Sequence, residues 1–249
     1  MRRYATEFAG TFFLVFTVCN TVLAKADLAP LAIGAVLAAM VFAGGHISGA
    51  HYNPAVTVAV FLRGRLPVRD VAPYFAAQLL AGTAAAGIAR WLAGPPADPA
   101  LAVHGKGIAV AFVAELLVTF ALAYVVLSVA TSQDHPNNSF YGLAIGFTVL
   151  AGAVAVGGLS GGAFNPAVAL GVSIVGLVSW SMLWIFLVAN LAGGALAAVA
   201  FRLLNPTDLA DPSPPAAAEP AEQLVRQDEP DPNGSVPAGQ DAQPTNRGR

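Results

Sequence analysis

The chain has 249 residues, of which 56% are hydrophobic and 10% are charged, and its formal net charge is −2. Ordinary soluble domains carry about 25% charged residues, so this composition excludes a soluble domain and predicts a membrane protein. The single cysteine, Cys19, excludes an internal disulfide and a cysteine-based metal site. No cofactor and no nucleic-acid partner are expected.

Six apolar stretches are long enough to span a bilayer, which requires roughly 20 residues. They cover Tyr4–Leu23, Leu28–Ala43, Val71–Leu92, Gly107–Ala130, Phe140–Val156 and Ser179–Leu203. An alternative for the first is a signal peptide, since Arg2 and Arg3 precede it and Ala24-Lys25-Ala26 resembles a cleavage site. A matching segment in the second half of the chain favours a retained span.

Two shorter apolar stretches, Pro54–Leu62 and Pro166–Val175, cannot span and are predicted to be re-entrant half-helices. Irregular backbone at membrane depth is tolerated only where protein or a water-filled cavity surrounds it. The segments that lead into both stretches are rich in glycine, which suits close packing of irregular backbone. These glycines are Gly44, Gly45, Gly49, Gly157, Gly158, Gly161 and Gly162.

Each half-helix starts with an Asn-Pro-Ala triplet, formed by residues 53–55 and 165–167. Asn is a favoured N-cap and Pro fits the first helical position. Each Asn oxygen should accept a bond from a following backbone N–H, which leaves the amide NH2 as a donor. Because helix N-termini carry partial positive charge, two facing starts would suit a neutral molecule with a lone pair and repel a cation.

The triplets belong to a longer repeat with an offset of 165 − 53 = 112 residues. Leu31-Ala32-Ile33-Gly34 recurs as Leu143-Ala144-Ile145-Gly146, and the Glu-x-x-x-Thr-Phe pattern that begins at Glu7 recurs at Glu115. Each half thus contains three spans and one half-helix. Because three is odd, the halves enter the membrane from opposite sides. This 3+3 inverted repeat predicts an all-α membrane protein with a site near the midplane.

The distribution of Lys and Arg predicts both termini in the cytoplasm. Six cationic residues fall on that side and three on the other: Arg2, Arg3, Arg63, Arg65, Arg69 and Arg202 against Lys25, Arg90 and Lys106. We expect a channel domain over residues 1–204, with repeat halves at about 4–93 and 107–204. Residues 205–249 hold nine of the 18 prolines and eight of the 14 acids, which predicts a disordered tail. Either an inert tail or a regulatory one fits this composition.

Glu7 and Glu115 are the acids within the predicted spans, at equivalent repeat positions. An acid inside a membrane is a functional candidate. A proton-coupled site is one interpretation; the favoured one is structural, with each carboxylate accepting N–H bonds from the loop beside its half-helix. His46 and His51 are expected in the first loop, and with no third ligand nearby they predict no metal site.

The stretches His46–Thr57 and Ser160–Ala167, together with the paired Glu-x-x-x-Thr-Phe helices, resemble the aquaporin family of major intrinsic proteins. The resemblance covers residues 4–204 and implies six spans, two half-helices and a homotetramer with one pore per subunit in the lipid bilayer. It implies that Asn53 and Asn165 are donors in the pore, and that Glu7 and Glu115 brace the two loops. It also implies a ladder of backbone carbonyls from Gly49, Ala50, His51, Gly161, Gly162 and Ala163.

The resemblance fails at the selectivity filter, whose four positions fall on Ile33, Ala153, Gly162 and Val168. Most of the family has Arg where this chain has Val168, and water-selective members also carry Phe and His at other filter positions. Some plant vacuolar-membrane members with broadened permeability resemble this chain in having Val there. The expected constriction is therefore wide and apolar, unless another polar side chain compensates.

The sequence predicts a passive channel for water and small neutral solutes such as glycerol, urea, ammonia or hydrogen peroxide, not an enzyme. We expect a multi-pass protein of the cell membrane, in a bacterial inner or plasma membrane. One alternative is a water-only channel with a compensated filter. Others are a coupled secondary transporter, which would need a titratable site such as Glu7 and Glu115, and a structural junction protein.

Overall fold

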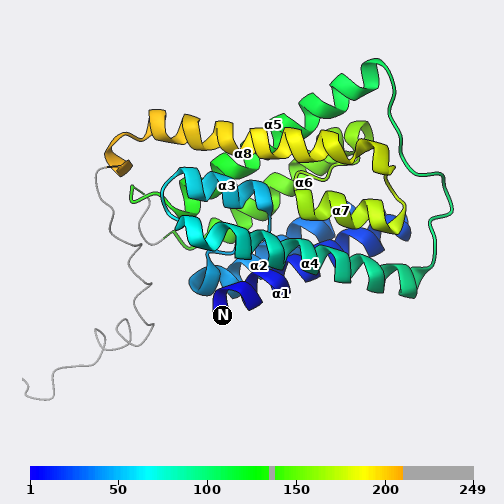
Figure 1. The fold of residues 1–249 in the computed structure, drawn as a ribbon, viewed down its shortest axis with the longest axis horizontal. Helices are drawn as coiled ribbons and strands as arrows, with labels where there is room; N and C mark the ends of the chain where they lie inside the picture. Colours follow the sequence, from blue (N-terminus) through cyan, green and yellow to red (C-terminus); the bar gives the residue numbers. More distant parts are fainter. Residues whose placement is uncertain (135–137, 210–249) are drawn as a thin grey trace, which may run out of the picture. The chain divides into compact units, whose positions relative to one another are not determined.

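The computed structural model describes residues 1–134 and 138–209, which form helices joined by short connections (Figure 1). The longer helices are α1 (Arg2–Leu23), α2 (Ala29–Ser48), α4 (Val68–Ala93), α5 (Lys106–Ala130), α6 (Tyr141–Ser160) and α8 (Leu183–Leu204). The shorter ones are α3 (Pro54–Leu62), α7 (Pro166–Val175) and the 3₁₀ turns η1 (Trp180–Met182) and η2 (Thr207–Leu209). Six of the described helices are long and apolar enough to cross a bilayer, which confirms the predicted fold class.

Both half-helices begin and end at the predicted residues, but α2 and α6 are longer than predicted. They continue through the glycine-rich stretches and end only where Gly49 and Gly161 adopt left-handed backbone, with φ of 84° and 98°. The expected irregular backbone at Gly44, Gly45, Gly157 and Gly158 is therefore wrong. His46 likewise lies in the last turn of α2 and not in a loop.

The glycine at 44 serves close packing within this regular helix. A side chain at Gly44 would collide with the ring of Tyr52, which returns across α2 from the loop before α3. The Tyr52 hydroxyl donates to the carbonyl oxygen of Met40 at 3.0 Å. Small size at this position, and not backbone freedom, is what the fold requires.

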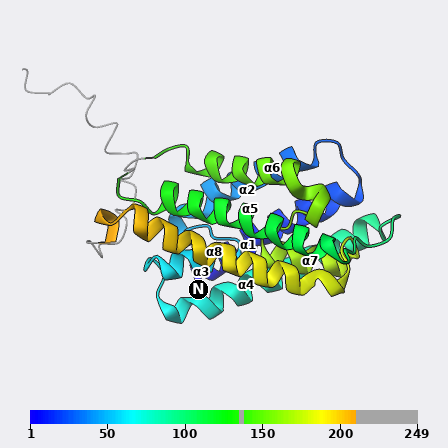
Figure 2. The same cartoon turned by 90° about the horizontal axis from the view of Figure 1, so that it is seen from above.

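The helices pack as two equivalent sets. α1 packs on α2 and α4, and in the second half α5 packs on α6 and α8. Each half-helix packs on the last span of the other half, so that α3 lies against α8 and α7 lies against α4. α3 and α7 lie toward opposite ends of the helical assembly (Figures 1 and 2). This arrangement is the predicted inverted repeat.

Glycines permit the closest of these approaches. A Cβ on Gly82 of α4 would lie 2.7 Å from the carbonyl oxygen of Ala167, and one on Gly194 of α8 would collide with the carbonyl of Ala55. These two glycines are themselves 112 residues apart. At the contact between α2 and α6, Gly34 and Gly146 meet each other's backbone in the same way.

Residues 205–209 pack against the channel domain. Asp208 in η2 is 2% exposed and contacts Arg63 at the end of α3. The expected boundary at residue 204 therefore precedes a short segment that belongs with the helices. The rest of the tail expected from composition, residues 210–249, lies outside the described residues.

Candidate pore site

The two half-helices start at asparagine N-caps. The Oδ1 atom of Asn53 accepts a bond from the N–H of Ala55 at 2.8 Å, and Asn165 accepts one from Ala167 at 2.9 Å. A proline occupies the first position of each helix. This local geometry fixes both asparagine side chains at the meeting point of the half-helices, because their oxygens are held by their own helices.

The amide groups of the same asparagines connect the two halves. The Nδ2 atom of Asn53 donates to the carbonyl oxygen of Phe164 at 2.9 Å, and that of Asn165 donates to the carbonyl of Tyr52 at 2.8 Å. An amide NH2 carries two N–H donors. One of each pair therefore holds the facing loop, and one remains for a solute. The sequence had left both donors free.

The loops before the half-helices contain backbone that side chains rarely adopt. Ala50, Tyr52 and Phe164 have φ of 50°, 49° and 49°. Left-handed backbone costs a non-glycine residue roughly 1–2 kcal/mol, so other interactions must hold these residues in place. The carboxylates of Glu7 and Glu115 supply them.

Glu7 on α1 is fully buried and binds the first loop. Its Oε1 accepts from the Ser48 hydroxyl at 2.7 Å and from the N–H of His51 at 3.0 Å. Its Oε2 accepts from the N–H of Tyr52 at 2.7 Å and from the amide of Gln78 at 2.9 Å. Four donors surround this carboxylate, so its buried charge is well compensated.

Glu115 on α5 repeats the part of this pattern that concerns the loop. It accepts from the Ser160 hydroxyl at 2.7 Å, from the N–H of Ala163 at 3.0 Å and from the N–H of Phe164 at 2.7 Å. The residue equivalent to Gln78 is Asn190, whose Oδ1 accepts from Thr119 at 3.1 Å. Its Nδ2 has no hydrogen-bond partner within the part of the chain that the structure describes.

The carbonyl groups of the two loops remain unbonded. Because the backbone N–H groups of residues 51, 52, 163 and 164 point at the two acids, they do not pair with neighbouring carbonyls. Among the described residues, no backbone N–H bonds the carbonyl oxygens expected to form the ladder. These are Gly49, Ala50, His51, Gly161, Gly162 and Ala163.

A cavity of about 30 Å³ lies beside both asparagines. All four predicted filter positions line it, together with both asparagines and six further residues. Its lining residues are Leu14, Val18, Ile33, Asn53, Leu122, Val149, Ala153, Gly162, Ala163, Phe164, Asn165 and Val168. Such a volume holds one or two water molecules. Apart from the two asparagines, every lining side chain is apolar, so no polar side chain in this lining replaces the arginine that Val168 lacks.

Sequence reasoning missed four side chains of this lining: Leu14, Val18, Leu122 and Val149. A signal for two of them was present. Leu14 follows Glu7 by seven residues and Leu122 follows Glu115 by seven, which places each about two turns along the same helix face. Extending the repeated Glu-x-x-x-Thr-Phe pattern would have found both.

His51 belongs to the support of the first loop. It is 6% exposed, and its Nδ1 lies 3.1 Å from the Thr57 hydroxyl. That hydroxyl also receives a bond from Gln78 at 3.0 Å. Within residues 1–134 and 138–209, no group of three His, Cys, Asp or Glu side chains is placed to hold a metal ion.

Fold and site together define a membrane channel, in which two half-helices meet at a narrow cavity between six spans. Comparison with known proteins agrees. Residues 1–201 match the family model for major intrinsic proteins. The chain is 37% identical over 222 residues to glycerol uptake facilitator protein-like 6 of Lactiplantibacillus plantarum, covering 84% of this chain and 100% of the relative.

Two further comparisons extend this result. The chain is 35% identical to aquaporin NIP1-4 of Oryza sativa subsp. japonica, over 81% of this chain and 76% of that protein. The structure of the aquaglyceroporin from Plasmodium falciparum superimposes with a TM-score of 0.69 at 22% identity, covering 83% of this chain and 98% of that one. This last similarity concerns the fold alone.

The chain belongs to the major intrinsic protein family. It is therefore a passive channel for water and small neutral solutes, and not an enzyme. Its helices make it a multi-pass membrane protein.

Proposed function

We propose that solutes cross this protein through the cavity beside Asn53 and Asn165, and that the channel conducts glycerol and other small neutral solutes as well as water. The observation that carries this proposal is the apolar lining at Ile33, Ala153, Gly162 and Val168. A wall without charge or hydrogen-bond demand discriminates mainly by width, and so admits solutes such as urea, ammonia or hydrogen peroxide. A relative named as a glycerol uptake facilitator supports glycerol among them.

In this mechanism, the free N–H of each asparagine amide donates to a passing oxygen. The unbonded carbonyls of the two loops accept from its hydroxyl or N–H groups. Glu7 and Glu115 act as braces that turn the loop N–H groups away from the path. Cations are repelled by the partial positive charge at the two half-helix N-termini, because the filter holds no arginine.

A second candidate is a water-only channel, which the small cavity volume favours. Leu14 and Leu122 are large side chains beside the filter and narrow the path from opposite repeats. In that case the missing arginine is compensated by size and not by charge.

Stopped-flow light scattering on proteoliposomes separates the two candidates. Water and glycerol gradients are applied to the native protein, to Val168→Arg and to Val168→Leu. We expect fast water and glycerol flux in the native protein, and loss of glycerol flux in Val168→Arg. The Val168→Leu variant adds bulk without charge and separates width from electrostatics. Fast water flux without glycerol flux in the native protein would establish the water-only channel.

The same proteoliposomes test cation rejection. We expect a measurable proton leak through the native channel that Val168→Arg abolishes, because a fixed positive charge in a narrow apolar path repels hydronium. Equal proton tightness in the two proteins would mean that the half-helix termini are sufficient.

We further propose a homotetramer with one pore per subunit, and both termini in the cytoplasm of a bacterial cell. The six-to-three bias of cationic residues supports this orientation. Native mass spectrometry in detergent measures the subunit number. Protease added to inside-out vesicles should remove the C-terminal tail, and protease added to right-side-out cells should not.

A further inference from the structure

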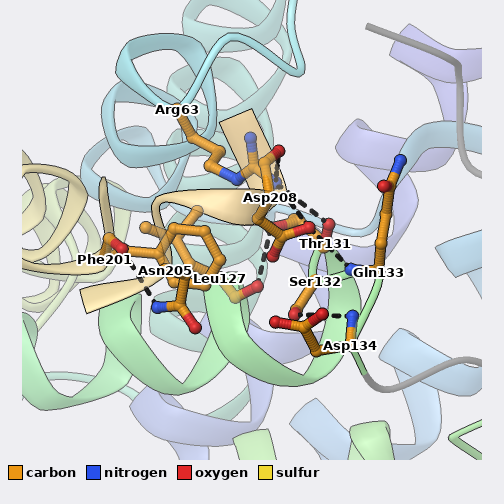
Figure 3. Close-up of polar contacts among 9 residues, drawn as sticks. All are labelled: Arg63, Leu127, Thr131, Ser132, Gln133, Asp134, Phe201, Asn205 and Asp208. Atoms are coloured by element: carbon orange, nitrogen blue, oxygen red, sulfur yellow. Dashed lines mark hydrogen bonds and ion pairs between the residues drawn. The ribbon is translucent and has the colours of Figure 1, made fainter. Parts of the chain in front are cut away.

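A buried ion pair connects the end of the first half-helix to the segment that follows the last span. Arg63 is the C-cap of α3 and is 5% exposed, and Asp208 in η2 is 2% exposed. The guanidinium Nη2 lies 3.4 Å from the Asp208 carboxylate and donates to the Asp208 carbonyl at 3.2 Å (Figure 3). We refer to residues 205–209 as the clasp.

The pair also contacts a third segment. Arg63 donates to the carbonyl of Thr131 at 3.5 Å, and the N–H of Gln133 donates to the Asp208 carboxylate at 2.9 Å. The guanidinium carbon lies 4.9 Å from the centre of the Phe201 ring on α8. The end of α3, the end of α5 and the end of α8 are thus held together at one point.

This charge is expensive to bury without its partner. Burial lowers the pKa of the Arg63 guanidinium, as does the neighbouring charge of Arg65, while Asp208 raises it. An arginine stays protonated in a protein, so a cation without a partner must move toward water. Since Arg63 is the cap of a nine-residue helix, its movement displaces the end of α3.

The second half-helix has no equivalent of this pair. The position 112 residues after Arg63 is Val175, and α7 ends at Gly176 in left-handed backbone. The carbonyl of Val175 accepts a bond from Arg90 of α4 at 3.0 Å. Only one of the two helices that carry a pore asparagine therefore depends on the segment after α8.

We propose that Asp208 is a positioning residue for the pore, which acts through Arg63 to fix α3 and thereby the amide of Asn53. This inference rests on the proposed role of Asn53 in the path of the solute. It makes the clasp part of the channel, and gives whatever acts on the C-terminal segment a direct mechanical connection to one half of the pore.

The first test is hydrogen–deuterium exchange on the full-length protein, which needs no flux. Asp208→Asn removes the charge and keeps the shape, and Asp27→Asn, at an exposed acid, is the matched control. We expect amide exchange in α3 to accelerate about three- to thirtyfold in Asp208→Asn while α7 stays unchanged. Equal acceleration in α3 and α7, or none, would overturn the proposal, since a general loss of stability affects both.

The second test is the activation energy of water flux in proteoliposomes, which does not depend on the number of folded channels. We expect it to rise in Asp208→Asn and to return toward the native value in Arg63→Met/Asp208→Asn, where neither charge remains. A double variant as altered as the sum of both single variants would overturn the coupling through Arg63. A native protein without flux would contradict the proposed pore but leave the exchange result standing.

Arg63→Lys covers the case in which Asp208→Asn is not recovered from the membrane. Lysine keeps the positive charge but has no planar group to stack on Phe201 or to bond two carbonyls. We expect a smaller rise in α3 exchange and in the activation energy. Values identical to those of the native protein would show that the pair does not position α3.

Discussion

The two halves of the molecule hold their loops with the same backbone contacts but with different side chains. Glu7 accepts two loop N–H groups, a serine hydroxyl and the amide of Gln78. Glu115 accepts two loop N–H groups and a serine hydroxyl, and the shorter Asn190 leaves its Nδ2 without a bond among the described residues. The common part is what a re-entrant loop needs, and the remainder has diverged.

The difference extends to the residues around each acid. In the first half, Thr57 bonds Gln78 and lies within reach of His51, and Tyr74 donates to the carbonyl of Ser48 at 2.7 Å. In the second half the equivalents of Thr57 and His51 are alanines, and that of Tyr74 is a phenylalanine. The first loop is stabilised by a polar network, whereas the second relies on apolar packing.

The largest expected effect comes from neutralising the two acids separately. Glu7→Gln should lower the free energy of unfolding by about 3 kcal/mol and Glu115→Gln by about 2 kcal/mol, because charge-assisted bonds are lost and Glu7 has one donor more. Thermal unfolding in detergent measures both. A larger loss at Glu115 would mean that the extra bonds of Glu7 contribute nothing.

Next in size are the glycines that face the two triplets. Gly82→Ala and Gly194→Ala should each cost about 2 kcal/mol, since the new methyl group meets a backbone carbonyl that cannot move aside. Gly87→Ala on α4 is the matched control. No atom lies within 4 Å of a Cβ there, so this change should stabilise α4 by up to about 1 kcal/mol. Unequal costs at the two contact glycines would show that the packing of the two half-helices is not equivalent.

A smaller effect is expected from exchanging the two amides. Gln78→Asn withdraws a donor from both Glu7 and Thr57 and should cost about 1 kcal/mol. Asn190→Gln brings an amide within reach of Glu115 and should cost less, because the gained bond offsets the added bulk. Unfolding temperatures of the two variants decide this, and a costlier change at Asn190 would refute the comparison.

The smallest effect concerns the arginines at the ends of the half-helices. Arg202 donates to the last carbonyl of α3 at 3.0 Å, as Arg90 does to that of α7. A cation at a helix C-terminus contributes about 0.5 kcal/mol. Arg90→Met should cost more than Arg202→Met, since α3 also ends at Arg63. Identical unfolding temperatures would indicate that Arg63 does not share this role.

Much of this fold was predictable because its signals are local. The Asn-Pro pairs define where α3 and α7 begin, and the short apolar runs define where they end. The ends of α2 and α6 were predicted four or five residues too early, because glycine was taken to indicate irregular backbone. At Gly44 the requirement is room for Tyr52, which depends on a contact between segments distant in sequence.

The site was less predictable than the fold for the same reason. The repeat pointed to Asn53, Asn165 and the two acids, but the bonds that connect each asparagine to the opposite loop exist only once the halves have met. Gln78 and Asn190 are single polar residues within apolar spans, and no local pattern distinguishes them. Asp208 stands in a stretch whose composition is that of a tail, and only its contact with Arg63 reveals its place.

The contact between Gly34 and Gly146 has one more consequence. The two residues meet as one residue meets its own copy across the axis of a symmetric dimer. In this respect the chain is a dimer whose two subunits are joined by the connection between α4 and α5. Once both copies share one polypeptide, each side of the axis can change independently, and a channel with two unlike entrances becomes accessible to evolution.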